Sequence, residues 1–62
     1  MSAREQALVV EDDPLVRRVL VILLERLGFE VRSASDGLSA QDELDGHQFE
    51  LVVTDLRMPG LD

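Results

Sequence analysis

Apolar residues in this chain follow two patterns, short runs of strand length and a longer stretch in which they recur every three or four positions. The first run, residues 7–10, is continuously apolar and ends at the acidic segment 11–13. Such a run predicts a central strand of a parallel sheet, because both faces of that strand are covered. Residues 29–34 alternate between apolar and polar, which predicts a strand with one wetter face, and residues 51–53 predict a third strand.

The stretch between the first two predicted strands has the pattern of a helix that begins at Pro14. Asp13 is placed to cap the free amides, and a proline at the first helical position loses no hydrogen bond. Gly28 is expected to end the helix in a left-handed C-terminal cap. Apolar residues at helical spacing form one predicted core stripe, which consists of Val16, Val19, Leu20, Leu23 and Leu27.

A second, weaker helix is predicted between the second and third strands. It follows a turn at 35–37, continues to about Leu44 and ends at residues 45–46. The predicted order is therefore β-α-β-α-β. Strands and helices that alternate with short connections indicate an α/β fold with a parallel sheet and right-handed crossovers.

The first predicted helix carries more apolar surface than one stripe requires. Val21 lies about 140° from the centre of the predicted core stripe, and Leu15 and Ile22 lie about 100° to 120° away on the other side. Either this surface is a contact site for another protein, or additional structure buries the helix on both sides. Arg17 and Arg18 are expected to project into solvent.

The composition limits the class of protein. The 62 residues carry 13 acids and 6 bases, a net charge of -7 that argues against a nucleic-acid module. The longest apolar run has six residues, too few for a membrane span of about 20. The absence of cysteine excludes disulfides and favours a reducing, cytoplasmic location. Without a disulfide or zinc, a chain this short depends on a bound ion, another chain or further sequence for its stability.

Acidic residues follow two of the predicted strands. Glu11, Asp12 and Asp13 come after the first strand, and Asp55 comes after the third. Parallel strands end at one edge of their sheet, so these carboxylates converge if the first strand lies between the other two. The like charges repel each other there unless they share a cation, and carboxylate oxygens suit Mg²⁺. A carboxylate beside Mg²⁺ can also attack phosphorus and become an aspartyl phosphate.

Four segments, in order, resemble the N-terminal half of the response-regulator receiver domain, the phosphoacceptor module of two-component signalling. They are LVVEDD at 8–13, LGFEV at 27–31, ASDGLSA at 34–40 and LVVTDLRMPGLD at 51–62. The resemblance implies half of a flavodoxin-like, doubly wound parallel sheet with strand order 2-1-3. We therefore expect residues 1–6 to form a tail and residues 7–62 to form a truncated receiver domain, its first three strands and first two helices.

The resemblance also implies a role for each acidic position. Asp55 is the phosphoacceptor, which attacks the phosphorus of a phosphohistidine on a histidine kinase or phosphotransfer protein. Asp12 is a direct Mg²⁺ ligand, Glu11 holds a metal-bound water, and Arg57 offers its backbone carbonyl. A receiver also uses a Ser or Thr after its fourth strand and a Lys after its fifth. These 62 residues contain no Lys, so the phosphoacceptor site is expected to be incomplete in this segment.

Three classes of function remain open. The favoured one is a phosphorelay signalling module that is not an enzyme. The second is a half-receiver that is not phosphorylated and that self-associates through its third strand or first helix, or docks on a kinase. An aspartate-nucleophile phosphatase is disfavoured, because it needs a second Asp at the position of Arg57. In receivers the first helix docks on the kinase, which makes Leu15 and Ile22 candidate contacts, whereas His47 is expected to be a surface residue.

Overall fold

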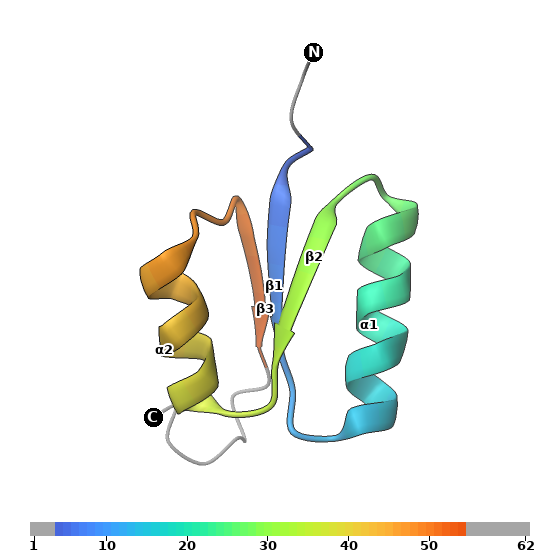
Figure 1. Cartoon of the computed structure of the whole chain (residues 1–62). Coiled ribbons are helices and arrows are strands. Elements are labelled where there is room, and N and C mark those ends of the chain that lie inside the picture. Colours follow the sequence, from blue (N-terminus) through green and yellow to red (C-terminus); the bar gives the residue numbers. More distant parts are fainter. Residues whose placement is uncertain (1–3, 55–62) are drawn as a thin grey trace.

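The computed structural model describes residues 4–54, which form five elements (Figure 1). The elements are β1 (Gln6–Val10), α1 (Pro14–Arg26), β2 (Glu30–Ala34), α2 (Gly37–Gly46) and β3 (Leu51–Thr54). This order confirms the predicted β-α-β-α-β arrangement. The element bounds differ little from those expected, since β1 begins one residue early, β2 begins one residue late and β3 ends one residue late.

The three strands form one parallel sheet in the order β2-β1-β3, as expected. β1 is central, and its last residue, Val10, is in register with Ala34 of β2 and Thr54 of β3. The carboxyl ends of all three strands therefore lie at one edge of the sheet, the lower edge in Figure 1. The segments that follow β1 and β3 both start from this edge.

The two helices cover opposite faces of the sheet, with β1 buried between them (Figure 1). Leu8 and Val10 point to the α2 side, where they pack with Ala34 and Ala40. Ala7 and Val9 point to the α1 side, where they pack with Leu24. This alternation explains why the first run has no polar position, because each of its residues faces one of two separate cores.

An aspartate caps each helix at its beginning. The Asp13 carboxylate accepts hydrogen bonds from the amides of Leu15 and Val16 at 2.9 and 3.2 Å, and Pro14 is the first residue of α1, as predicted. The Asp36 carboxylate accepts from the Ser39 amide at 2.8 Å. The sequence pattern at 35–37 predicted a turn but not this second cap.

Gly28 follows the last turn of α1 as expected. Its φ of 100° is in the left-handed region that favours glycine, and its amide donates to the Glu25 carbonyl at 3.0 Å. The Phe29 amide then donates to the Leu24 carbonyl at 3.1 Å, so the chain reverses tightly into β2.

The predicted core stripe of α1 is wrong, because the face of the helix that packs on the sheet is rotated about the helix axis by about one residue from the predicted face. The side of α1 that faces the sheet carries Leu24, which is buried, together with Leu20 and Val21, which are half-buried. Val21 is thus packed against the core, and its predicted place on the surplus apolar surface of the helix is wrong. Four members of the predicted stripe are exposed, by 43% at Val16, 49% at Val19, 52% at Leu23 and 74% at Leu27.

The error has a physical origin at the first turn of α1. The stripe that packs on the sheet begins with Arg17. Because arginine is charged, the hydrophobic pattern predicts that this position faces solvent. An arginine can occupy such a position at the rim, where its aliphatic stem packs and its guanidinium reaches a polar partner. Because α1 is apolar around most of its circumference, the pattern alone selects the wrong face.

β3 is the least covered strand. It pairs with β1 alone, and within residues 4–54 neither helix lies close to it. Leu51 and Val52 are exposed by 36% and 44%, and Val53 is half-buried against the α1-side core. Two unpartnered apolar surfaces therefore exist in the described part of the chain, the exposed stripe of α1 and β3.

Candidate functional site

The predicted acidic pair lies directly after β1, at the carboxyl edge of the sheet. Glu11 is buried, with 6% of its surface exposed, and it is the only buried charged residue of the described segment 4–54. Its amide donates to the Ala34 carbonyl at 3.0 Å, which extends the pairing with β2 one residue beyond the strand. Asp12 is exposed. The edge thus presents one carboxylate held in the fold and one open to solvent.

The loop that carries these acids is held by side chains as well as by the sheet. The Glu11 carboxylate accepts a hydrogen bond from the Asp13 amide at 3.1 Å. The Arg17 guanidinium donates to the Glu11 carbonyl at 2.8 Å. The expectation that Arg17 projects into solvent is therefore wrong, since its side chain is half-buried, while Arg18 is exposed as predicted.

Two of the four predicted site residues, Asp55 and Arg57, lie outside the described residues. Val10 and Thr54 form the last pair between β1 and β3, so the residues that come next in sequence are Glu11 and Asp55. Within residues 4–54, no cluster of three acidic, histidine or cysteine side chains is placed to hold a metal ion. Of the predicted site residues, the structure places Glu11 and Asp12 at this edge of the sheet.

The donor set of this pair fits a hard cation. Both side chains offer only carboxylate oxygens, and one oxygen of Glu11 is fixed by the Asp13 amide. Mg²⁺ prefers oxygen ligands and uses one or two protein carboxylates with several waters. The exposure of Asp12 leaves room for such waters.

A groove of about 540 Å³ lies beside the acidic loop, between α1 and the outer edge of β2. Pro14, Arg18 and Ile22 line it from successive turns of α1, and Ser33 lines it from β2. Arg17 also contributes to the groove. The side chains of Leu15 and Ile22, which the receiver resemblance marks as kinase contacts, are exposed by 71% and 40%.

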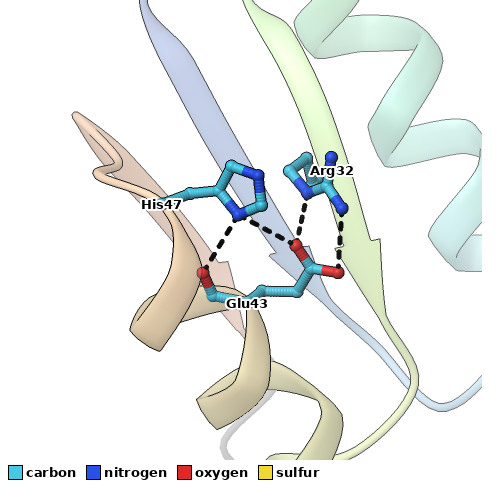
Figure 2. A network of polar contacts seen from close by, with 3 residues as sticks. All are labelled: Arg32, Glu43 and His47. Carbon is cyan, nitrogen blue, oxygen red and sulfur yellow. Dashed lines mark hydrogen bonds and ion pairs between the residues drawn. The ribbon is translucent and has the colours of Figure 1, made fainter.

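A separate polar network joins α2 to β2 away from the acidic edge (Figure 2). The Arg32 guanidinium donates two hydrogen bonds to the Glu43 carboxylate, the longer of them 3.3 Å. The His47 ring nitrogen Nδ1 lies 3.6 Å from the same carboxylate, and His47 is exposed as predicted. The hydrogen bond from Arg32 is the main reason that the pKa of Glu43 falls below its ordinary value, and the same bond raises the pKa of Arg32. No local pattern signals this pair, because eleven positions separate its members.

Comparison with known proteins shows the family of this chain. Residues 7–62 match the family model of the response regulator receiver domain, and the chain belongs to that family. It is 40% identical over 63 residues to the response regulator protein PilR of Pseudomonas aeruginosa, an alignment of 97% of this chain and 14% of PilR. It is 40% identical over 62 residues to the transcriptional regulatory protein FixJ of Bradyrhizobium diazoefficiens, covering 100% of this chain and 30% of FixJ.

A receiver-like segment also occurs in a kinase. The chain is 38% identical over 55 residues to the sensor histidine kinase RcsC of Escherichia coli, which covers 89% of this chain and 6% of RcsC. The chain therefore spans less than a third of the length of each of these relatives. In the part of the chain that the structure describes, no helix has the length and apolar character to cross a membrane.

Proposed function

We propose that the acidic edge is the phosphoacceptor site of a two-component signalling module, with Asp55 as the residue that becomes phosphorylated. The observation that carries this proposal is the parallel pairing of β1 with β3, which ends at Val10 and Thr54. Glu11 and Asp55 are the next residues of the two neighbouring strands. The family supports the same role, because receiver domains act with histidine kinases or phosphotransfer proteins.

The chain's own oxygens hold the cation in this proposal. Asp12 and Asp55 would hold Mg²⁺ together with the backbone carbonyl of Arg57, and Glu11 would hold a metal-bound water. Bound Mg²⁺ supplies positive charge that offsets the charge of the carboxylates and of the incoming phosphoryl group. The buried position of Glu11 and its bond from the Asp13 amide keep its carboxylate at the site before any cation arrives.

Phosphotransfer then needs one nucleophile. A carboxylate oxygen of Asp55 attacks the phosphorus of a phosphohistidine, the P–N bond breaks, and its electron pair returns to the imidazole nitrogen of the donor. The product is an acyl phosphate on Asp55. We place this signalling activity, rather than enzymatic turnover, in the receiver domain expected at residues 7–62, with the cytoplasm as the location. Gln6, which was expected in the N-terminal tail, is the first residue of β1. The net charge of -7 disfavours direct contact of this segment with nucleic acid.

Phosphorylation is tested with a small phosphodonor such as phosphoramidate in the presence of Mg²⁺, followed by intact and peptide mass spectrometry. The 62-residue chain is assayed alone and after fusion to the segment that follows the matched region in FixJ. We expect Mg²⁺-dependent addition of one phosphoryl group to the fusion. Asp55→Asn abolishes it, and Asp42→Asn, a change at an exposed acid of α2, leaves it intact. Label that survives Asp55→Asn would contradict the assignment.

A second candidate is favoured by the two uncovered apolar surfaces. A half-receiver that is not phosphorylated can self-associate through the open edge of β3 and the exposed stripe of α1. Two copies that pair β3 antiparallel about a two-fold axis close the β3 edge of each copy.

Sedimentation across a concentration series tests this second candidate. We expect a dimer that Leu23→Asp and Val52→Lys convert to monomer. Leu38→Lys, a change at an apolar residue on α2 that is 84% exposed, serves as the control and leaves the dimer intact. A folded monomer at every concentration contradicts self-association.

A further inference from the structure

Arg17 occupies an unusual position for a charged residue on α1. It lies on the sheet-facing stripe with Leu20, Val21 and Leu24, and its side chain is half-buried. Arg18, its neighbour in sequence, is exposed and has no hydrogen bond among the described residues. The two side chains are chemically identical, but only Arg17 has a hydrogen-bond partner among the described residues, so a comparison of the two isolates the effect of position 17.

The partner of Arg17 is the backbone carbonyl of Glu11, at 2.8 Å from the guanidinium. This carbonyl lies just beyond the last paired residue of β1, Val10, so the sheet offers it no strand amide. A backbone acceptor at a buried residue needs a partner, and a charged donor makes a strong one. Arg17 therefore satisfies the first carbonyl that the sheet leaves open.

The Glu11 carbonyl belongs to the same planar peptide group as the Asp12 amide. The Glu11 amide is already fixed by its 3.0 Å bond to the Ala34 carbonyl. The backbone of Glu11 is therefore held by β2 through its amide and by α1 through its carbonyl. This peptide plane also fixes the direction of the N–Cα bond of Asp12, and so the place of the Cα atom from which its side chain branches.

We propose that Arg17 is a positioning residue of the acidic edge, which orients the Glu11–Asp12 peptide and thereby holds both carboxylates ready for a cation. This inference rests on the proposed function for its purpose, but its geometry is independent of any metal. Arg17 touches neither substrate nor cation in this account. It acts through the Glu11 backbone. Its place in the groove between α1 and β2 puts the same side chain beside the surface where a docking partner is expected.

The experiment compares Arg17→Met, which keeps the aliphatic stem, with the matched control Arg18→Met in the full chain without metal. Triple-resonance NMR reports the carbonyl ¹³C shift of Glu11 and the amide shifts of Asp12 and Asp13. We expect Arg17→Met to move the Glu11 carbonyl resonance upfield and to shift both amides, because the carbonyl loses its donor. Arg18→Met leaves all three resonances in place.

A conservative variant separates positioning from general stabilisation. Arg17→Lys keeps a charged donor at the end of a long stem, so the Glu11 carbonyl shift returns toward its original value. If Arg17→Met does not fold, Arg17→Gln, whose side chain is too short to reach the carbonyl, replaces it. Unchanged Glu11 and Asp12 shifts in the Met or Gln variant relative to the Arg18 control overturn the proposal.

A Mg²⁺ titration followed by the same amides tests the purpose of the contact. Loss of an outer partner of a metal ligand costs about tenfold in metal affinity, and we expect that loss for Arg17→Met but not for Arg18→Met. Equal Mg²⁺ affinity in the two variants overturns the positioning role. If the unsubstituted chain binds no Mg²⁺, these 62 residues lack a working cation site, the fusion protein tests the proposed function, and the metal-free shifts still decide whether Arg17 orients the peptide.

Discussion

Individual acidic side chains of this chain have three different structural roles. Asp13 and Asp36 accept backbone amide bonds at the beginning of a helix, Glu43 pairs with Arg32 across two elements, and Glu11 is buried at the sheet edge. Sequence patterns identified the Asp13 cap because Pro14 follows it. They did not identify the Asp36 cap, where the next residue is Gly37 and the helix pattern is weak.

The Asp36 cap gives the first prediction. Asp36→Ala removes the acceptor for the Ser39 amide and is expected to lower the free energy of unfolding by about 1 kcal/mol. Asp36→Asn keeps a side-chain oxygen and is expected to lose much less. Urea denaturation followed by circular dichroism measures both, since the chain has no Trp or Tyr. Equal losses in the two variants would show that the cap bond is unimportant.

The Glu43 pair gives a second prediction, on pH. The hydrogen bond from Arg32 lowers the pKa of Glu43 below its ordinary value of 4.5. A lowered pKa means that the folded state favours the charged form, so the contribution to stability is present above about pH 4.5 and disappears as the pH falls below it. The advantage of the unsubstituted chain over Glu43→Gln should therefore shrink between pH 6 and pH 3.

The matched control is Asp42→Asn, at the exposed neighbouring acid of α2. Denaturation midpoints at several pH values provide the measurement. The effect of Glu43→Gln is small, because exposed ion pairs are screened by solvent. A difference between Glu43→Gln and the unsubstituted chain that stays constant down to pH 3 would exclude a role for the charge of Glu43.

At the scale of whole elements, the short strands were easier to predict than the face of the long helix. A continuous run such as 7–10 has only one arrangement that covers both of its sides, so β1 and its neighbours follow from the pattern. α1 is apolar on several faces, and the pattern cannot choose among them. The choice comes from tertiary geometry, in which Leu24 packs on Ala7 and Val9 and Arg17 reaches Glu11.

The orientation of α1 gives a third prediction. Leu24 is 8% exposed, so Leu24→Ala is expected to cost about 2 to 4 kcal/mol of stability or to prevent folding. Leu23 is 52% exposed, and Leu23→Ala is expected to cost less than about 1 kcal/mol. The core stripe predicted from the sequence gives the opposite order. Denaturation of the two variants under the same conditions distinguishes the two orientations.

At the scale of the whole molecule, the described part of the fold contains two of the four expected site residues. The family resemblance identified the order 2-1-3, and the parallel pairing of β1 with its two neighbours confirms it. Glu11 and Asp12 lie at the expected edge, whereas Asp55 and Arg57 lie outside the described residues and stay predictions. The Arg17 contact could not be predicted, because it depends on how α1 turns relative to the sheet.

Mg²⁺ should stabilise the whole chain, which is the fourth prediction. A cation that binds the folded acidic edge and not the unfolded chain raises the melting temperature by mass action. Millimolar Mg²⁺ is expected to produce this rise, and Asp12→Ala to remove most of it. The control is Asp45→Asn, at the end of α2. Melting curves from circular dichroism that are identical with and without Mg²⁺ would show that the 62-residue chain has no working cation site.

The position of β3 at the edge of the sheet also determines which strand is expected to separate first in local unfolding. Within residues 4–54, β3 contacts the other elements only through β1, and its partner residues are 44 positions away in sequence, whereas β1, α1 and β2 all contact one another. Local unfolding begins with the element that has the fewest contacts. The β3 amides are therefore expected to exchange their hydrogens with solvent faster than those of β1. Asp55 follows that strand directly in the sequence. The element that leads to the proposed phosphoacceptor is thus the one whose release from the sheet costs the least free energy, and a bound cation or phosphoryl group that joins Asp55 to Glu11 and Asp12 would slow this exchange.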